Sequence, residues 1–162
     1  MKKQYLLSIA ALLLIIPAAV SQETKTISRD WTAFVQSINV ESKSTKKFKL
    51  EGFIKVVSDD QNSNAGLWAR VDNKDDSQGF VDYMEDRFVK ASDWKSYTIE
   101  GTIDAKSKSL SFGGSCEFNG RFLFDNFKLF IENDKGVLEL VPIQNNSFEQ
   151  PLKSGSVAKW TP

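Results

Sequence analysis

Apolar and polar residues alternate along much of this chain, and a period of two predicts β-strands. The clearest segment is 46–57, where Phe48, Leu50, Ile54 and Val56 share one face. Successive side chains of a strand point to opposite faces, so this segment would bury one face and leave the other in water. Further strand candidates between turn-forming residues are 30–40, 67–71, 80–84, 94–103, 109–118 and 120–131, and the chain holds about eight in all. Helical periodicity is weak throughout, and the pattern predicts an all-β antiparallel sandwich of jelly-roll type.

Two connections have the composition of hairpin turns. The polar run 72–79 separates the candidates 67–71 and 80–84, which we expect to pair. In that pair Asp82 would meet Arg70 in a charge-assisted hydrogen bond. Asn119-Gly120 is a strong two-residue turn signal, and it predicts a second hairpin between 109–118 and 120–131.

One face of the predicted sheet has the composition of a binding surface. Trp68 and Arg70 alternate with the apolar Leu67, Ala69 and Val71, so they point away from the core. Aromatic rings stack on the C–H faces of sugars, while charged side chains bind the hydroxyl groups. The expected ligand-binding residues are Trp68, Arg70, Asp82, Phe53, Lys55 and Met84. Alternatively, Trp68, Phe53 and Met84 fill a second hydrophobic layer beneath a loop, and Arg70 and Asp82 form an internal pair.

The first 21 residues have the features of a signal peptide. A basic start, Lys2-Lys3, precedes the apolar run 5–16, and Ala19-Val20-Ser21 offers small residues for cleavage before Gln22. We therefore expect a secreted or periplasmic protein. A membrane anchor is the alternative, but the run is short and ends at Pro17.

The charge balance argues against nucleic acid and anionic membranes as partners. Without Lys2 and Lys3 the chain has 19 basic and 21 acidic side chains, so no excess of positive charge attracts phosphate. Cys116 is the only cysteine, which excludes an intramolecular disulfide.

The absence of histidine from the chain excludes several catalytic sites. A Ser-His-Asp triad, a Cys-His pair and an HExxH zinc site all need that residue. Paired carboxylates for glycoside cleavage remain arithmetically possible among Glu51, Asp82, Glu85 and Asp86, but acids are common on strands and in turns. We expect a binding module without catalytic activity.

Several segments together resemble a known family. They are FKLEGFIKV, GLWARVD, GFVDYMEDR, DW with KSYTIEG, SLSFGGS and GRFLFDNFKL, and they span about residues 31–131. The succession looks like a galactose-binding-like jelly roll, similar to bacterial carbohydrate-binding domains and found beside secreted hydrolases such as tail-specific serine peptidases. The resemblance implies a glycan ligand or a neighbouring protein domain as partner.

The same resemblance implies a structural calcium ion and no other cofactor. In such modules an Asp in a pattern similar to Phe124-Asp125-Asn126-Phe127 holds Ca²⁺. Here Asn126 replaces a frequent second acid, and one Asp supplies only one of about six oxygen ligands. Alternatively, Asp125 is hydrogen-bonded to backbone within its strand.

The C-terminal residues are similar to the opening of another jelly-roll module. Asn145-Asn146-Ser147-Phe148-Glu149 and the later Trp160 carry this likeness. We expect a module over 22–133, followed by a linker and the start of a possible second module over 134–162. Alternatively, this tail packs back on the first module as an extra strand.

Two functions are consistent with these residues. The first is a secreted module that binds carbohydrate and assists an attached or partner enzyme. The second is a structural or protein-interaction domain without a sugar ligand.

Overall fold

A computed structural model describes residues 30–152 and 156–162, and the expected signal peptide lies outside them. The described residues form eight strands and no helix. In this part of the chain there is accordingly no helix that is long and apolar enough to cross a membrane. The strands are β1 (Trp31–Asn39), β2 (Lys46–Val57), β3 (Asn64–Asn73), β4 (Gln78–Asp82), β5 (Lys95–Ile103), β6 (Ser107–Glu117), β7 (Arg121–Glu132) and β8 (Leu138–Val141).

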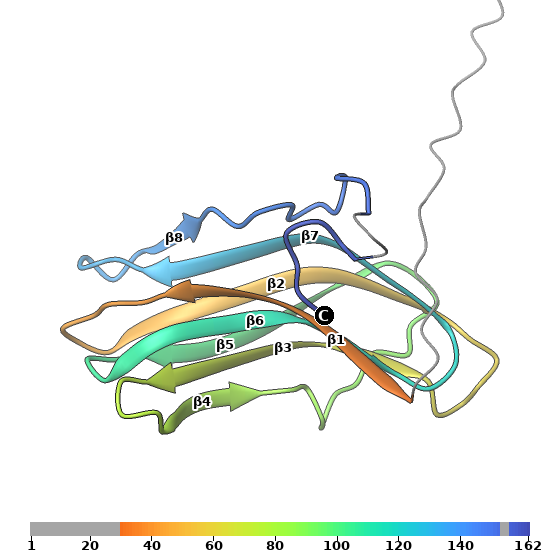
Figure 1. Ribbon diagram of the computed structural model, residues 1–162, viewed down its shortest axis with the longest axis horizontal. Coiled ribbons are helices and arrows are strands. Elements are labelled where there is room, and N and C mark those ends of the chain that lie inside the picture. Colours follow the sequence, from red (N-terminus) through yellow and green to blue (C-terminus); the bar gives the residue numbers. More distant parts are fainter. Residues whose placement is uncertain (1–29, 153–155) are drawn as a thin grey trace, which may run out of the picture.

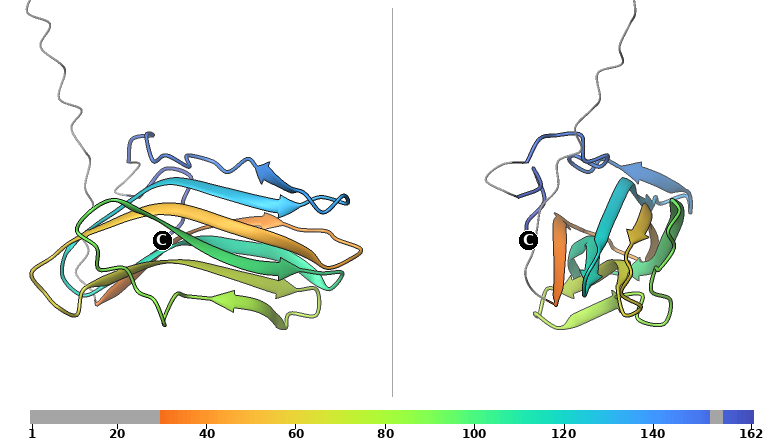
Figure 2. Two further views of the ribbon diagram at one scale, coloured as in Figure 1. Left: turned by 180° about the vertical axis from the view of Figure 1, so that it is seen from behind. Right: turned by 90° about the vertical axis from the view of Figure 1, so that its right-hand side faces the viewer.

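The strands form two antiparallel sheets of four strands each, which confirms the predicted β-sandwich (Figure 1). One sheet has the order β1-β6-β3-β4 and is called the β1 sheet below. The other has the order β5-β2-β7-β8 and is called the β2 sheet. The two layers are visible from the end of the sandwich in the right panel of Figure 2.

The core lies between the sheets and follows the alternation in the sequence. On β2, Leu50 and Ile54 are buried while Phe53 between them is exposed. From the β1 sheet, Leu67 and Phe112 are buried against them in the same cluster. Burying each of these side chains contributes about 1.5–3 kcal/mol to the free energy of unfolding. The burial pattern therefore gives each sheet a distinct inner and outer face.

One predicted hairpin is confirmed and the other is wrong. β3 and β4 pair as an antiparallel hairpin. β6 and β7 do not pair, because β6 lies between β1 and β3 while β7 lies between β2 and β8. Asn119-Gly120 therefore carries the chain from one sheet to the other. The Asn119 carbonyl accepts hydrogen bonds from the hydroxyls of Ser58 and Ser63, which ties this crossing to the β2–β3 loop.

The C-terminal residues complete the same sandwich. β8 pairs with β7, so the boundary expected at residue 133 falls inside the β2 sheet. Trp160 is only 4% exposed and belongs to the core cluster. Its ring stacks on Phe148 and meets the edge of Phe34, and Thr161 exchanges two backbone hydrogen bonds with Val35 on β1. Of the two arrangements expected for this tail, the described residues adopt the one that packs back on the sandwich (Figure 2).

Candidate ligand-binding face

Trp68 lies on the outer face of the β1 sheet, over a glycine. Its register partner on β6 is Gly113. A Cβ atom at Gly113 would lie 3.2 Å from Trp68 Nε1 and 1.8 Å from the carbonyl oxygen of Phe34. Only glycine fits this position without a shift of the backbone, because a side chain there would overlap a neighbouring strand. The indole is thereby held close against the sheet.

Tyr83 extends the aromatic surface beyond Trp68. β4 ends at Asp82, which is opposite Ala69, so the next residue comes beside Trp68. The two rings stack with centroids 6.1 Å apart and planes 28° from parallel. Tyr83 is 40% exposed, so one partner of the stack is open to solvent.

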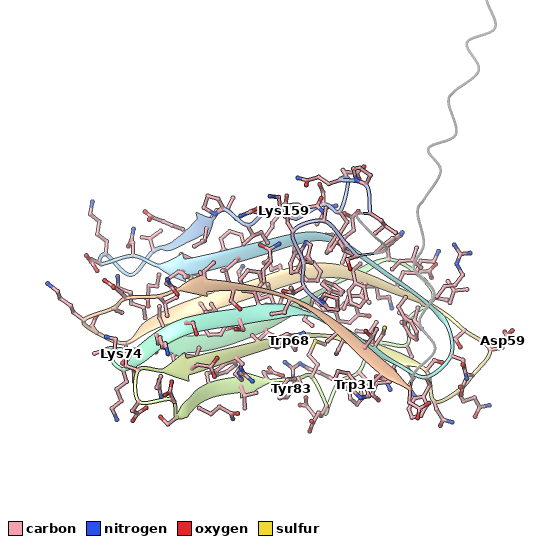
Figure 3. The ribbon with its side chains drawn as sticks, in the orientation of Figure 1. Trp31, Asp59, Trp68, Lys74, Tyr83 and Lys159 are labelled. Atoms are coloured by element: carbon pink, nitrogen blue, oxygen red, sulfur yellow. The ribbon has the colours of Figure 1, made fainter. Side chains whose placement is uncertain are left out.

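Trp31 adds a third ring at the start of β1. Its register partner is Glu117 on β6, and alternation from the core-packed Phe34 places Trp31 on the outer face. It is 62% exposed, the highest value among the exposed large apolar side chains described. Figure 3 labels Trp31, Trp68 and Tyr83 in one region, around β3 and the end of β4. These three residues are called the aromatic face below.

A charged pair lies on the same face, but it is not the predicted pair. The Arg70 guanidinium binds Asp72, with Nε 3.0 Å from Oδ1. Arg70 is opposite Val81, whereas Asp82 is opposite Ala69. The predicted Arg70–Asp82 hydrogen bond is therefore not formed.

Asp82 holds the turn that follows β4. Its Oδ1 accepts a hydrogen bond of 2.7 Å from the backbone N–H of Met84, and its Oδ2 binds the Arg87 guanidinium. Hydrogen bonding to Asp82, and then to Asp86, raises the pKa of Arg87 above its ordinary value. The Asp82 carboxylate, next to Tyr83, is thus engaged in interactions within the protein.

Met84 is a core residue and not a margin of the binding surface. It is 1% exposed, and its Sδ lies 3.3 Å from the backbone nitrogen of Leu67. Its φ of 55° turns the chain out of the extended conformation, so the alternation expected to continue to residue 84 ends with β4.

Phe53 and Lys55 lie on the outer face of the opposite sheet. Phe53 is on β2, between Ser96 of β5 and Asp125 of β7. The outer faces of the two layers of a sandwich point in opposite directions. Of the six expected ligand-binding residues, the structure therefore brings only Trp68 and Arg70 together on one outer face.

Asp125 has a backbone partner. Its Oδ1 accepts a hydrogen bond of 2.7 Å from the N–H of Asn126. Among the described residues, no group of three or more His, Cys, Asp or Glu side chains is placed to hold a metal ion. The calcium site stays a prediction that rests on the sequence resemblance.

Two hollows of the described residues lie apart from the aromatic face. Hollows of about 280 and 300 Å³ occur at two loop regions, lined by residues such as Asp60 and Lys90 in one and Lys46 and Asp134 in the other. Neither is lined by Trp31, Trp68 or Tyr83. Neither hollow is therefore part of the aromatic face.

Sequence reasoning missed Trp31 and Tyr83 as surface residues. Trp31 and Phe34 both fall in the predicted strand 30–40, and their odd separation in sequence puts them on opposite faces. Tyr83 and Val81 are two residues apart, so they point to the same side. Whether that side faces outward depends on the register of the hairpin, which the turn sets. Alternation alone would have found Trp31.

Comparisons with known proteins add no relative to this description. No family model, no curated protein and no solved structure matches the chain.

Proposed function

We propose that this protein is an exported, non-catalytic module of jelly-roll, galactose-binding-like type that binds carbohydrate through the aromatic face. The observation that supports the proposal best is the clustering of Trp31, Trp68 and Tyr83 on one outer face of a β-sandwich. Two of these rings are well exposed, although exposure of large aromatic side chains costs hydrophobic stabilisation.

The chemistry of this face suits a sugar. Aromatic rings pack against the apolar C–H faces of pyranoses, and each such contact is worth on the order of 1 kcal/mol beyond area burial. The neighbouring Arg70–Asp72 pair offers guanidinium donors and carboxylate acceptors for hydroxyl groups. Single-site affinity would be weak, and attachment to further modules or to a partner enzyme would increase retention through avidity.

Three of the four carboxylates considered for glycoside cleavage are held in ion pairs, which supports a binding role. Asp82 and Asp86 are both bound to Arg87, and Glu51 is bound to Lys49. A general acid needs a raised pKa, whereas the hydrogen bond from Arg87 lowers the pKa of Asp86. These acids act within ion pairs on this account, and the protein itself does not cleave its ligand.

A protein-interaction domain is the second candidate, and one edge of the β2 sheet favours it. Val137, Leu138 and Leu140, on and beside the edge strand β8, are exposed apolar residues. An exposed apolar edge strand can accept a strand of a neighbouring domain. This role would leave the aromatic face without a ligand.

The test is retention of the purified protein on insoluble cellulose, xylan, mannan and chitin. The wild type is expected to be retained by at least one polymer, and Trp68→Ala to pass through with its cooperative thermal unfolding preserved. Trp94→Ala is the matched control, because Trp94 is an exposed tryptophan outside the aromatic face. Passage of the wild type through all four polymers would contradict carbohydrate binding, and unfolding of Trp68→Ala would reassign Trp68 to the core.

A further inference from the structure

We infer that the ligand is an uncharged polysaccharide chain held at two subsites, one at Trp68 with Tyr83 and one at Trp31. This inference rests on the proposed carbohydrate-binding function and names the class of ligand. Its first basis is the distance between the two subsites. Their partners on β6, Gly113 and Glu117, are four residues apart.

That separation exceeds a single sugar. Four residues of a strand span about 13 Å, and β1 and β3 lie about 10 Å apart on either side of β6. One pyranose ring cannot stack on both indoles over this distance. A chain of several linked sugars can place one ring on each, so Trp31 would matter only for longer ligands.

The positions between the two subsites carry small side chains. Ala33, Ser115 and Gly66 lie in one register row across β1, β6 and β3. This row is halfway between the row of Trp68 and Gly113 and the row of Trp31 and Glu117. The Gly66 end of this row is covered, because a Cβ there would lie 3.4 Å from Met84 Cβ and 3.5 Å from the Tyr83 carbonyl oxygen. A chain between the subsites would therefore cross at Ser115 and Ala33, where the side chains are small.

Unpaired hydrogen-bonding groups lie on β3 in the rows on either side of this one. Trp68 Nε1 and Asn64 Oδ1 are the buried side-chain polar atoms without a partner among the described residues. Asn64 is only 5% exposed, and its amide nitrogen donates to Glu117 Oε2 at 3.1 Å, which leaves its oxygen as a free acceptor. Burying a polar atom without a partner is costly. A sugar hydroxyl can both donate and accept, so a chain at this row would supply the missing partners if the side chains that bury these two atoms shift on binding.

The charge at the Trp31 subsite selects against acidic polymers. Glu117 contributes a carboxylate there, and the positive charge of Arg70, on the other side of Trp68, is balanced by Asp72. A polyuronate would bring like charge to Glu117 without a free cation on the described outer face of β3 to balance it. The favoured ligand is therefore uncharged and rich in hydroxyl groups.

The experiment measures affinity against chain length by calorimetry. The probes are the two-unit and six-unit oligosaccharides of whichever polymer among cellulose, xylan, mannan and chitin retains the protein, with polygalacturonate as the charged comparison. For the wild type, we expect the six-unit probe to bind at least tenfold more tightly than the two-unit probe. Trp31→Ala should lose about tenfold in affinity for the six-unit probe and nothing for the two-unit probe. Trp94→Ala should match the wild type for both.

The outcomes separate this inference from the proposed function. Equal affinity for both lengths, or an unchanged six-unit affinity in Trp31→Ala, would overturn the two-subsite chain while leaving carbohydrate binding intact. Tighter binding of polygalacturonate than of the six-unit neutral probe would overturn the inference that the ligand is uncharged. Retention on none of the polymers would instead count against the proposed function itself.

Discussion

The outer faces of the two sheets both carry exposed aromatic residues, yet they differ in what surrounds those residues. On the β1 sheet, Trp68 and Tyr83 stack on each other above a glycine. On the β2 sheet, Glu51 lies two residues before the exposed Phe53. Its Oε1 lies 2.7 Å from Lys49 Nζ in an ion pair. Lys49 also lies 4.8 Å above the ring of Phe130.

Exposure of an aromatic ring is therefore not sufficient to identify a binding face. Long charged side chains among the rings of the β2 sheet cover apolar area and keep that face hydrated. The β1 sheet instead places small residues between its rings and leaves buried polar atoms without partners.

Gly113→Ala should have the largest effect, because a methyl group there overlaps the backbone of β1. We expect the free energy of unfolding to fall by about 3 kcal/mol. Gly66→Ala, on the same face, is the matched control, since its nearest new contact would be an ordinary 3.4 Å to Met84 Cβ. Urea denaturation compares the two. Equal stability of both variants would show that Trp68 does not depend on a close approach to β6.

Met84→Ala should lower the free energy of unfolding by about 2 kcal/mol or more, because it empties a buried site. Met84→Leu keeps the volume and should cost less than about 1.5 kcal/mol. The measurement is again urea denaturation. A neutral Met84→Ala variant with altered ligand binding would return Met84 to the margin of the binding surface.

Asp82→Ala should lower the free energy of unfolding by about 1 kcal/mol, since it removes the acceptor of the Met84 N–H and one partner of Arg87. The ion pair is partly solvated, which limits its contribution. Asp86→Ala is the control, because that side chain is 79% exposed and should change stability by less than about 0.5 kcal/mol. Thermal unfolding that ranks the two variants in the opposite order would contradict the assigned role of Asp82.

Phe53→Ala should have the smallest effect. The side chain is exposed on the β2 sheet, so we expect a change in stability below about 0.5 kcal/mol and unchanged retention on polysaccharide. Loss of retention in this variant, with stability preserved, would move the binding face to the other sheet.

Strand positions were predictable from the sequence because alternation is a local signal. The segment 46–57 coincides with β2, and the other candidates agree with observed strands to within a few residues. Sheet membership was not predictable, because alternation tells inward from outward but not which layer a strand joins. Phe53 and Trp68 have the same outward parity and lie on opposite sides of the molecule. The Asn119-Gly120 signal likewise could not show that β6 would find its partners at β1 and β3.

The candidate site was less predictable than the fold. The partner of Arg70 depends on a hairpin register, and that register is set by the turn, where Asp76 has a φ of 62° and the Asn73 N–H bonds to the Ser77 carbonyl. A shift of one residue exchanges the faces of Asp82 and Val81. Trp68 and Arg70 kept their expected face because both lie on a strand whose alternation is unbroken.

The most direct test of the binding face is to record the four tryptophan indole N–H signals by nuclear magnetic resonance during titration with the six-unit oligosaccharide of the retaining polymer. The chain has four tryptophans, and they sample the aromatic face (Trp31 and Trp68), an exposed site outside it (Trp94) and the core (Trp160). Single Trp→Phe variants assign the signals. We predict that the signals of Trp68 and Trp31 shift while those of Trp94 and Trp160 stay in place. A shift of Trp94 with Trp68 unmoved would contradict the account.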